Sequence, residues 1–298
     1  MSPSTRSSSV WFPVLLLLIA MTSIQGGAAL AKSLFPMVGA PGITALRLGL
    51  GTLILCAIFK PWRLRFSRKQ LVPLVLYGLA LGGMNYTFYL ALRTVPLGIA
   101  VALEFVGPLT LALAGSRKPL DFVWVVLALA GLWFLLPLNQ SISGVDPTGA
   151  LFALLAGVCW AVYILSGQRA GAEHGPATVA AGSLIASLVF VPVGFAFAEG
   201  NIWSLTILPI ALVVAVLSSA FPYTLEMMAL TRLPAKTFGT LMSLEPAMGA
   251  LSGMIFLGEL LTLPQWLGLL GIIAASVGAT LTLRPAKRKL DPVSELRE

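Results

Sequence analysis

The sequence predicts an all-α polytopic membrane protein, with ten transmembrane helices in two five-helix inverted repeats and both termini in the cytoplasm. Its composition, its apolar stretches and a short repeated motif predict this fold. Of the 298 residues, 58% are hydrophobic and only 10% are charged, whereas soluble domains carry about 25% charged residues. No polar stretch is long enough to form a separate soluble domain. We therefore expect the lipid bilayer to surround most of the chain.

Ten apolar stretches have about the length of a bilayer-spanning helix, and none alternates with the two-residue period of a barrel strand. They are Trp11–Ala31, Pro41–Phe59, Leu71–Leu92, Pro96–Gly115, Phe122–Leu138, Thr148–Ser166, Ala177–Ala198, Leu205–Ala229, Leu233–Leu257 and Pro264–Leu283. The first stretch has a competing interpretation as a cleavable secretory signal, because Arg6 precedes it and Ala29-Leu30-Ala31 ends it. Its apolar core continues past Gln25 to the length of a full span, which favours a retained helix.

The basic residues orient these spans. With a cytoplasmic N-terminus, sixteen of the nineteen Lys and Arg residues lie on the cytoplasmic side, including clusters at Lys60–Lys69 and Arg284–Lys289. Lys32 and Arg93 lie outside, and Arg47 lies within a span. The positive-inside rule predicts this orientation. Nucleic acid is not an expected partner, because the charges follow short loops without interleaved aromatic residues.

A short internal repeat indicates two related halves. Residues 91–96 (ALRTVP) recur 138 residues later as residues 229–234 (ALTRLP), and Pro108 recurs at the same shift as Pro246. Five spans separate the copies, so they fall on opposite faces of the membrane, as in the inverted repeats of secondary transporters. We divide the chain into a cytoplasmic tail (1–10), a first repeat (11–138), a periplasmic linker (139–147), a second repeat (148–283) and a cytoplasmic tail (284–298).

Charged residues inside the spans are candidate functional residues, because their burial in lipid is costly. Glu104 and Glu245 are expected near the bilayer centre, Glu226 near the cytoplasmic end of its span, and Arg47 in the outer third of its span. For Glu104 and Glu245, binding of substrate or protons competes with a structural role as protonated or paired carboxylates. For Arg47, a contact with substrate competes with a structural ion pair.

Two prolines and a set of uncharged polar residues add to these candidates. Pro108 is expected to free the carbonyl of Glu104, and Pro246 that of Met242, at a depth where a free carbonyl needs water, protein or ligand beside it. Hydrogen bonds between helices explain most uncharged polar residues in spans, but some of them are expected to line a substrate site. These residues are Gln25, Asn85, Tyr86, Tyr89, Trp160, Tyr163, Ser218, Tyr223 and Ser243.

The sequence lacks the motifs of the common enzyme and metal-binding classes. It has no GxxxxGK[ST] loop, no GxSxG elbow, no HExxH pair and no Cys–His ligand set, and Cys56 and Cys159 both fall in apolar runs. We therefore expect no enzymatic activity, no cofactor and no metal. Transport driven by an ion gradient needs only a titratable group in a gated cavity, so protons and a small solute are the expected partners. The sequence indicates no oligomeric state.

Several motifs resemble those of a known family. They are the Pro96 and Pro234 turns that open spans four and nine, residues 244–246 (LEP) and residues 256–259 (FLGE). On these motifs the chain resembles, over essentially its whole length, the EamA branch of the drug/metabolite transporter superfamily. Residues 23–27 (SIQGG), Arg47, 82–86 (GGMNY), 96–105 (PLGIAVALEF) and 166–171 (SGQRAG) are similar to those of bacterial inner-membrane members that export threonine and homoserine.

The resemblance implies export of small amino acids by proton antiport with alternating access. It implies a central cavity lined by spans one to four and six to nine, with spans five and ten peripheral. Arg47 would bind the carboxylate of the amino acid and a midplane glutamate its ammonium, with Gln25, Asn85 or Tyr163 as polar wall. Glu245 is the stronger candidate for proton coupling because it lies in the Glu-Pro motif of the family.

The first half departs from that motif, because Gly107 precedes Pro108 and the acid Glu104 lies one turn earlier. Whether Glu104 has the role of Glu245 stays open at this point. Two other functions also stay open. One is export of another metabolite or drug, such as an aromatic amino acid or a nucleobase, by the same fold, and the other is a membrane protein without transport activity, such as a sensor or scramblase.

Overall fold

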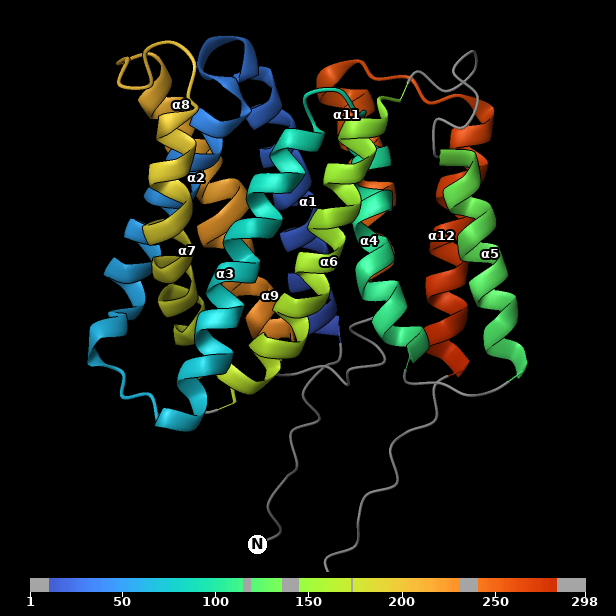
Figure 1. Ribbon diagram of the computed structural model, residues 1–298, viewed down its shortest axis with the longest axis horizontal. Helices are drawn as coiled ribbons and strands as arrows, with labels where there is room; N and C mark the ends of the chain where they lie inside the picture. The colour runs from blue at the N-terminus through green and yellow to red at the C-terminus, as the bar shows by residue number, and fades with distance from the viewer. Residues whose placement is uncertain (1–10, 115–118, 136–144, 173, 231–240, 283–298) are drawn as a thin grey trace, which may run out of the picture.

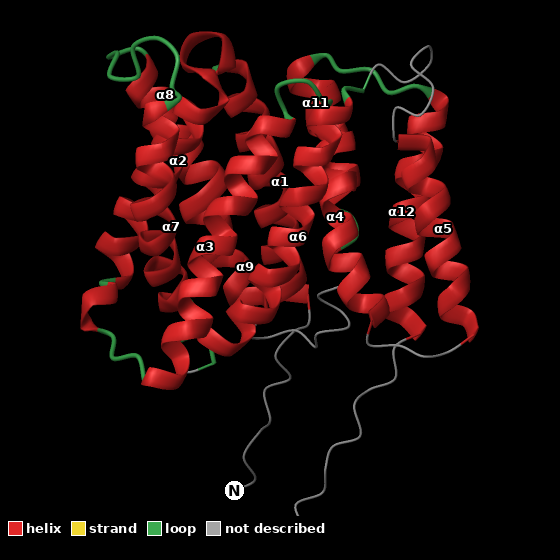
Figure 2. Cartoon of the chain, in the orientation of Figure 1, coloured by secondary structure: helices red, strands yellow, loops and turns green. Residues whose placement is uncertain are grey.

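The computed structural model describes residues 11–114, 119–135, 145–172, 174–230 and 241–282, and within these ranges helices form the whole fold (Figure 2). The first half contains α1 (Trp11–Ser33), α2 (Phe35–Phe59), the 3-10 turn η1 (Pro61–Arg63), α3 (Arg68–Ala91), α4 (Leu97–Ala114) and α5 (Pro119–Leu135). The second contains α6 (Pro147–Ala170), α7 (Ala177–Ala196), α8 (Ile207–Ala215), the π-helical turn η2 (Val216–Ala220), α9 (Phe221–Leu230), α11 (Glu245–Leu257) and α12 (Leu263–Thr282). The predicted all-α class is confirmed.

Several predicted features lie outside the described residues. They are the two tails with the Arg284–Lys289 cluster, residues 139–144 of the predicted linker, residues 231–234 of the second motif copy and the predicted start of the ninth span at Leu233.

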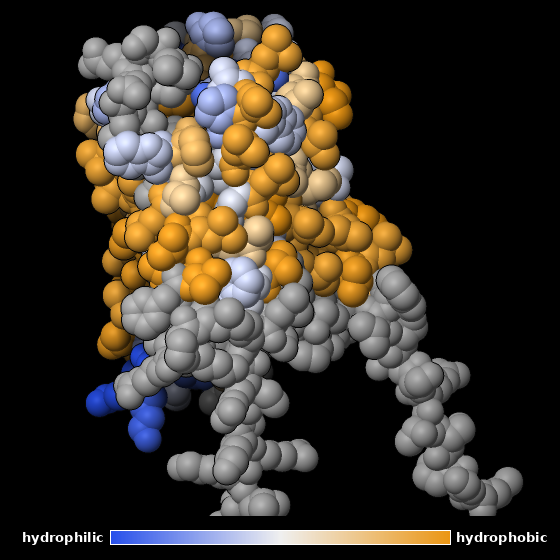
Figure 3. Space-filling model, turned by 90° about the vertical axis from the view of Figure 1, so that its right-hand side faces the viewer, coloured by the Kyte–Doolittle hydropathy of each residue, from blue (hydrophilic) through white to orange (hydrophobic). Residues whose placement is uncertain are grey.

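Six of the described stretches have the length and composition of membrane spans. The stretches α1, α2, α3, α6, α7 and α8–α9 are long and apolar enough to cross a membrane, and α4, α11 and α12 contain shorter apolar helices. Figure 3 shows a broad hydrophobic belt on the face formed by α5 and α12, with more polar residues above it. Exposed side chains of this face include Val123, Val126, Leu267 and Leu270. Such a surface fits lipid and is rare on soluble monomers.

Helix α2 begins earlier than the sequence predicts, at Phe35 instead of Pro41. A proline stands in its first turn, where the missing N–H costs nothing. Gly39 interrupts the helical dihedral angles with φ 69° and ψ 163°, a conformation that only glycine adopts readily. The chain therefore bends at Gly39, and Pro41 lies in the first turn of the helical segment that follows the bend, close to the predicted start of the span.

In its described part the ninth span, which was predicted as one helix kinked at Pro246, is interrupted just before Glu245. Residues 243 and 244 form a turn, and α11 begins at Glu245 with Pro246 in its first turn. Proline is favoured at the start of a helix because its φ is already helical. Pro246 therefore starts a helix, and Glu245 lies at the N-terminal end of α11. In contrast, α4 runs through Pro108 without a break.

A cap fixes the start of α6. The Asp146 carboxylate accepts hydrogen bonds from the Gly149 N–H at 2.8 Å and from the Thr94 hydroxyl at 3.0 Å. These bonds lower the pKa of the Asp146 carboxyl, the Gly149 bond having the larger effect. The same residue therefore starts α6 and ties it to the turn between α3 and α4.

The helices pack as one bundle (Figure 1). Helix α3 packs on α6 and α7, α2 on α7, α4 on α6 and α11, and α1 on α9 and α11. Helices α5 and α12 pair with each other at one edge, where α12 also contacts α4. Helix α1 begins and α12 ends at the same edge of the bundle in Figure 1. The helices from both halves thus surround a common centre.

Candidate functional site

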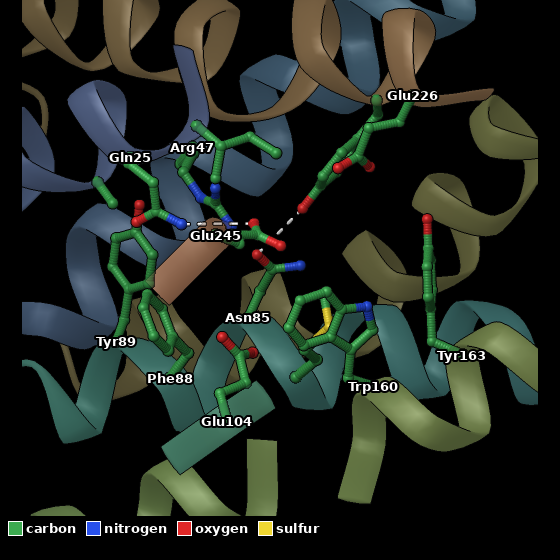
Figure 4. A pocket seen from close by; sticks show the side chains of 14 residues that line it. Gln25, Arg47, Asn85, Phe88, Tyr89, Glu104, Trp160, Tyr163, Glu226 and Glu245 are labelled. Carbon is green, nitrogen blue, oxygen red and sulfur yellow. Dashed lines mark hydrogen bonds between the residues drawn. The ribbon is translucent and has the colours of Figure 1, made fainter. Parts of the chain in front are cut away.

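A cavity of about 60 Å³ lies at this centre (Figure 4). About 10–15 Å³ of such space holds one water molecule, so the cavity has the scale of a small polar solute. Seven helices line it: α1, α2, α3, α4, α6, α9 and α11. The lining residues are Ile24, Gln25, Ala28, Arg47, Met84, Asn85, Phe88, Tyr89, Glu104, Trp160, Tyr163, Tyr223, Glu226 and Glu245.

The structure brings most of the sequence-predicted site residues together in this lining. Glu226, which was expected near the cytoplasmic end of its span, lies in the same cavity as Glu104 and Glu245. Tyr86, Ser218 and Ser243 are outside the lining. The Tyr86 ring packs toward Phe190 of α7, with ring centroids 5.9 Å apart, and Ser243 is buried in the turn before α11.

The apolar part of the lining was not predicted, because apolar residues do not stand out within an apolar span. Met84, Asn85, Phe88 and Tyr89 occupy one face of α3 at helical spacing. A search for apolar residues one turn from a polar candidate would have found this face. The expectation that span seven lines the cavity is wrong, because α7 packs behind α2 and α3.

Arg47 presents a free edge of its guanidinium. The side chain is 3% exposed, its Cζ lies 4.7 Å from the centroid of the Tyr89 ring, and its Nη1 donates to the Ser218 carbonyl at 2.7 Å. Its Nε and Nη2 are buried without a hydrogen-bond partner among the described residues. These two nitrogens share one edge of the guanidinium, so two parallel N–H groups are free to bind a carboxylate.

The local sequence explains why the Ser218 carbonyl is free to accept a hydrogen bond from Arg47. In an α-helix the Ser218 carbonyl would accept from residue 222, but Pro222 has no N–H. The helix widens here into the π turn Val216–Ala220, in which the Phe221 N–H bonds to the Val216 carbonyl. The Ser218 carbonyl is thus left for Arg47. Pro222 is the signal in the sequence for this anchor, which was not predicted.

Glu245 presents a free carboxylate oxygen. The residue is 5% exposed, and its Oε1 accepts a long hydrogen bond of 3.4 Å from Gln25 Nε2. Glu245 Oε2 and Gln25 Oε1 are buried without partners in the described part of the chain. Four polar atoms of the cavity are therefore open to a ligand: two donors on Arg47 and one acceptor each on Glu245 and Gln25.

The charges of the lining do not balance. Glu104, Glu226 and Glu245 are three carboxyl groups, and Arg47 is the one basic residue among the lining residues. Figure 4 shows Arg47 and Glu245 on one side of the cavity and Glu104 on the opposite side. Uncompensated charge is costly in a buried site. The cavity therefore favours bound cations or protons.

A neutral pair completes the polar lining. The Tyr223 hydroxyl donates to Asn85 Oδ1 at 3.2 Å, and Asn85 Nδ2 donates to the Leu81 carbonyl at 2.7 Å. Asn85 is 5% exposed and Tyr223 7%. The pair joins α3 to α9 across the cavity.

The carbonyl that Pro108 frees does not face the cavity. A Cβ atom on Gly157 of α6 would lie 2.5 Å from the Glu104 carbonyl oxygen, and one on Gly107 would overlap the Gly157 carbonyl. The missing side chains thus let α4 and α6 approach closely at this point. Of the expected neighbours of this carbonyl, which were water, protein or ligand, the structure shows protein, at the contact with α6.

An ion pair joins three segments at one end of the bundle. Lys32 Nζ donates to Glu259 Oε1 at 2.6 Å and to the Val95 carbonyl at 2.9 Å, and Glu259 Oε2 accepts from the Leu97 N–H at 2.7 Å. Their side chains are 20% and 15% exposed. The pair ties the end of α1 and the start of α4 to the loop after α11.

Comparisons with known proteins agree with this architecture. Residues 147–281 match the EamA-like transporter family. The threonine/homoserine exporter RhtA of Salmonella typhimurium (strain LT2) is 70% identical over 284 residues, which cover 95% of this chain and 96% of that protein. The protein of the same name from Escherichia coli (strain K12) is 68% identical over the same shares. A solved crystal structure of a protein superposes with a TM-score of 0.63 at 21% identity, covering 90% of this chain and 96% of that one, and so shares its fold.

Proposed function

The chain belongs to the EamA-like transporter family, and from this premise we propose that it exports threonine and homoserine. The chain is a multi-pass transporter of the bacterial inner membrane and not an enzyme, as its named relatives are exporters. Identity of 68–70% over nearly the full length supports amino-acid export. The cavity supports the proposed substrates independently.

One observation carries the proposal: the cavity has two open, oppositely charged groups. The free edge of Arg47 fits the carboxylate of a zwitterion, and Glu245 Oε2 fits its ammonium. Both are nearly fully buried, so a ligand that fills them removes two unpaired polar groups from the interior. An amino acid satisfies both with one small molecule, whereas a nucleobase offers neither charge.

The excess of carboxyl groups supports proton antiport. A bound zwitterion adds no net charge, so three carboxylates and one guanidinium still need protons for balance. Glu245 alone of the three acids combines a free oxygen with a position at the N-terminal end of α11. We assign to it the exchange of proton against the substrate ammonium, with Glu104 and Glu226 as further candidates. Export is then coupled to proton entry.

The packing supports ten spans in inverted repeats that alternate access to this cavity. Helix α6 pairs with α3 and α4, and α1 pairs with α9 and α11, as expected if α1 corresponds to α6 and each half has five spans. The proposed halves are residues 11–138 and 148–283, with both tails and Lys60–Lys69 cytoplasmic. The Lys32–Glu259 pair then lies at the periplasmic end and must open for release.

Transport by the purified chain in liposomes tests the proposal. With an acidic lumen, proton exit should drive accumulation of labelled threonine, and a protonophore should abolish it. Unlabelled homoserine should compete, while an aromatic amino acid and a nucleobase should not. Accumulation that ignores the pH gradient would refute proton antiport, and absence of threonine counterflow would refute the substrate assignment.

A further inference from the structure

We propose that Asn85 and Tyr223 together recognise the hydroxyl group of the substrate and thereby determine specificity within small amino acids. The inference rests on the proposed function, because it concerns the same cavity. Arg47 and Glu245 bind groups that every amino acid carries. The neutral pair on α3 and α9 is therefore the part of the lining suited to distinguish one side chain from another.

The orientation of the Asn85 amide is fixed by its neighbours. Nδ2 donates to the Leu81 carbonyl at 2.7 Å, and a reversed amide would place two oxygens against each other there. Oδ1 must therefore face Tyr223, and the Tyr223 hydroxyl must donate its proton to it, at 3.2 Å. Burial of both side chains keeps this arrangement in place.

This arrangement leaves one free donor on Asn85 and a free acceptor on the Tyr223 oxygen. An amide has two N–H groups, and Asn85 uses one on Leu81. The Tyr223 oxygen has donated its only proton, so it can now only accept from a ligand. A substrate hydroxyl donates one hydrogen bond and accepts others, so it satisfies the free N–H and the tyrosine oxygen at once. A methyl group in the same place satisfies neither.

The position of the pair suits hydroxyls on successive carbons. Asn85 lines the same cavity as Glu245, which we assign to the ammonium group, and Figure 4 shows both side chains pointing into it. The side chain of the substrate leaves the carbon that carries this ammonium. The donor and the acceptor lie on different residues, so a β-hydroxyl and a γ-hydroxyl can each reach one or both. Ile24, Met84 and Phe88 add apolar surface to the same cavity.

Competition with isosteric amino acids tests the inference. Valine has the shape of threonine and norvaline that of homoserine, but each has a methyl group in place of the hydroxyl. In counterflow of labelled threonine, both should compete on the order of 10- to 100-fold more weakly than their hydroxylated counterparts, because buried polar groups lose their partner. In Tyr223→Phe the half-maximal concentration of threonine should rise about 10-fold or more while that of valine stays the same.

Two further variants test whether the effect is specific to Asn85 and Tyr223. Thr224→Val removes a neighbouring hydroxyl on α9 that bonds to Ala220 of its own helix at 2.7 Å, and it should keep the wild-type preference for threonine over valine. Asn85→Leu should lose that preference as Tyr223→Phe does, and it provides the test if the tyrosine variant does not fold. A wild-type preference retained in Tyr223→Phe or in a folded Asn85→Leu overturns the inference alone. A wild-type protein that counterflows neither threonine nor homoserine overturns the proposed function and the inference with it.

Discussion

Replacement of Arg47 by lysine separates its charge from its geometry. The guanidinium uses Nη1 to hold the Ser218 carbonyl at 2.7 Å, lies on the Tyr89 ring, and keeps Nε and Nη2 free. The lysine ammonium is a point charge without a planar face or a second parallel donor. It cannot bind the Ser218 carbonyl and a substrate carboxylate with the same geometry. Arg47→Lys should therefore weaken substrate binding while the cavity keeps its charge.

The expected loss of substrate binding free energy follows from the contacts that lysine cannot make. A hydrogen bond to a charged group contributes about 1.5–3 kcal/mol, and a partly desolvated cation–π contact about 0.5–2 kcal/mol. Lysine keeps one charged bond to the substrate and loses the second one. We expect a net loss of about 1.5–3 kcal/mol in binding, which corresponds to roughly a 10- to 150-fold weaker affinity.

Counterflow of labelled threonine measures this change as the half-maximal concentration of competing threonine. Threoninol, which lacks the carboxylate, should compete about equally with both proteins, because its binding never used the free edge of Arg47. Arg93→Lys is the control, since its contact with Glu199 is 4.0 Å long and both side chains are more than half exposed. Unchanged threonine affinity in a folded Arg47→Lys protein would refute the carboxylate assignment.

Three other perturbations test coupling, topology and packing. Glu245→Gln should still exchange labelled threonine for unlabelled threonine in liposomes but should lose accumulation driven by a pH gradient; retained accumulation would move the coupling role to another acid. In intact cells, a cysteine at Ser67 should resist an impermeant thiol reagent while one at Asn139 reacts, and reversed labelling would contradict the proposed topology. Gly107→Ala should lower the melting temperature by about 2–6 °C, whereas Gly49→Ala, with its nearest neighbour at 3.6 Å, should change it little; equal shifts would contradict the close helix contact.

The polar half of the cavity could be predicted from the sequence for a simple physical reason. Lipid excludes polar side chains, so those within spans must face protein or water, and that condition alone gathers Gln25, Arg47, Asn85 and the three acids toward the centre. The same condition says nothing about apolar residues, which suit lipid and cavity equally. Phe88 and Met84 were therefore missed.

The helix ends were harder to predict than the polar lining, because a proline can lie either inside a helix or in its first turn. Pro108 and Pro246 look alike in the sequence, yet one lies inside α4 and the other starts α11. Which outcome holds depends on whether the preceding residues continue the helix, and tertiary contacts decide that. The pairing of Lys32 with Glu259 likewise joins residues 227 positions apart, and no local pattern indicates such a contact.

The two halves also explain why the first lacks the Glu-Pro motif. At the 138-residue shift of the repeat, Gly107 corresponds to Glu245. A side chain at 107 would overlap the Gly157 carbonyl, so a glutamate there would force α4 away from α6. In the first half the acid lies one turn earlier, at Glu104, and it still reaches the cavity. One half thus uses this position for a rigid helix contact and the other for an acid at a helix start. We therefore expect Glu104 and Glu245 to have different roles in transport.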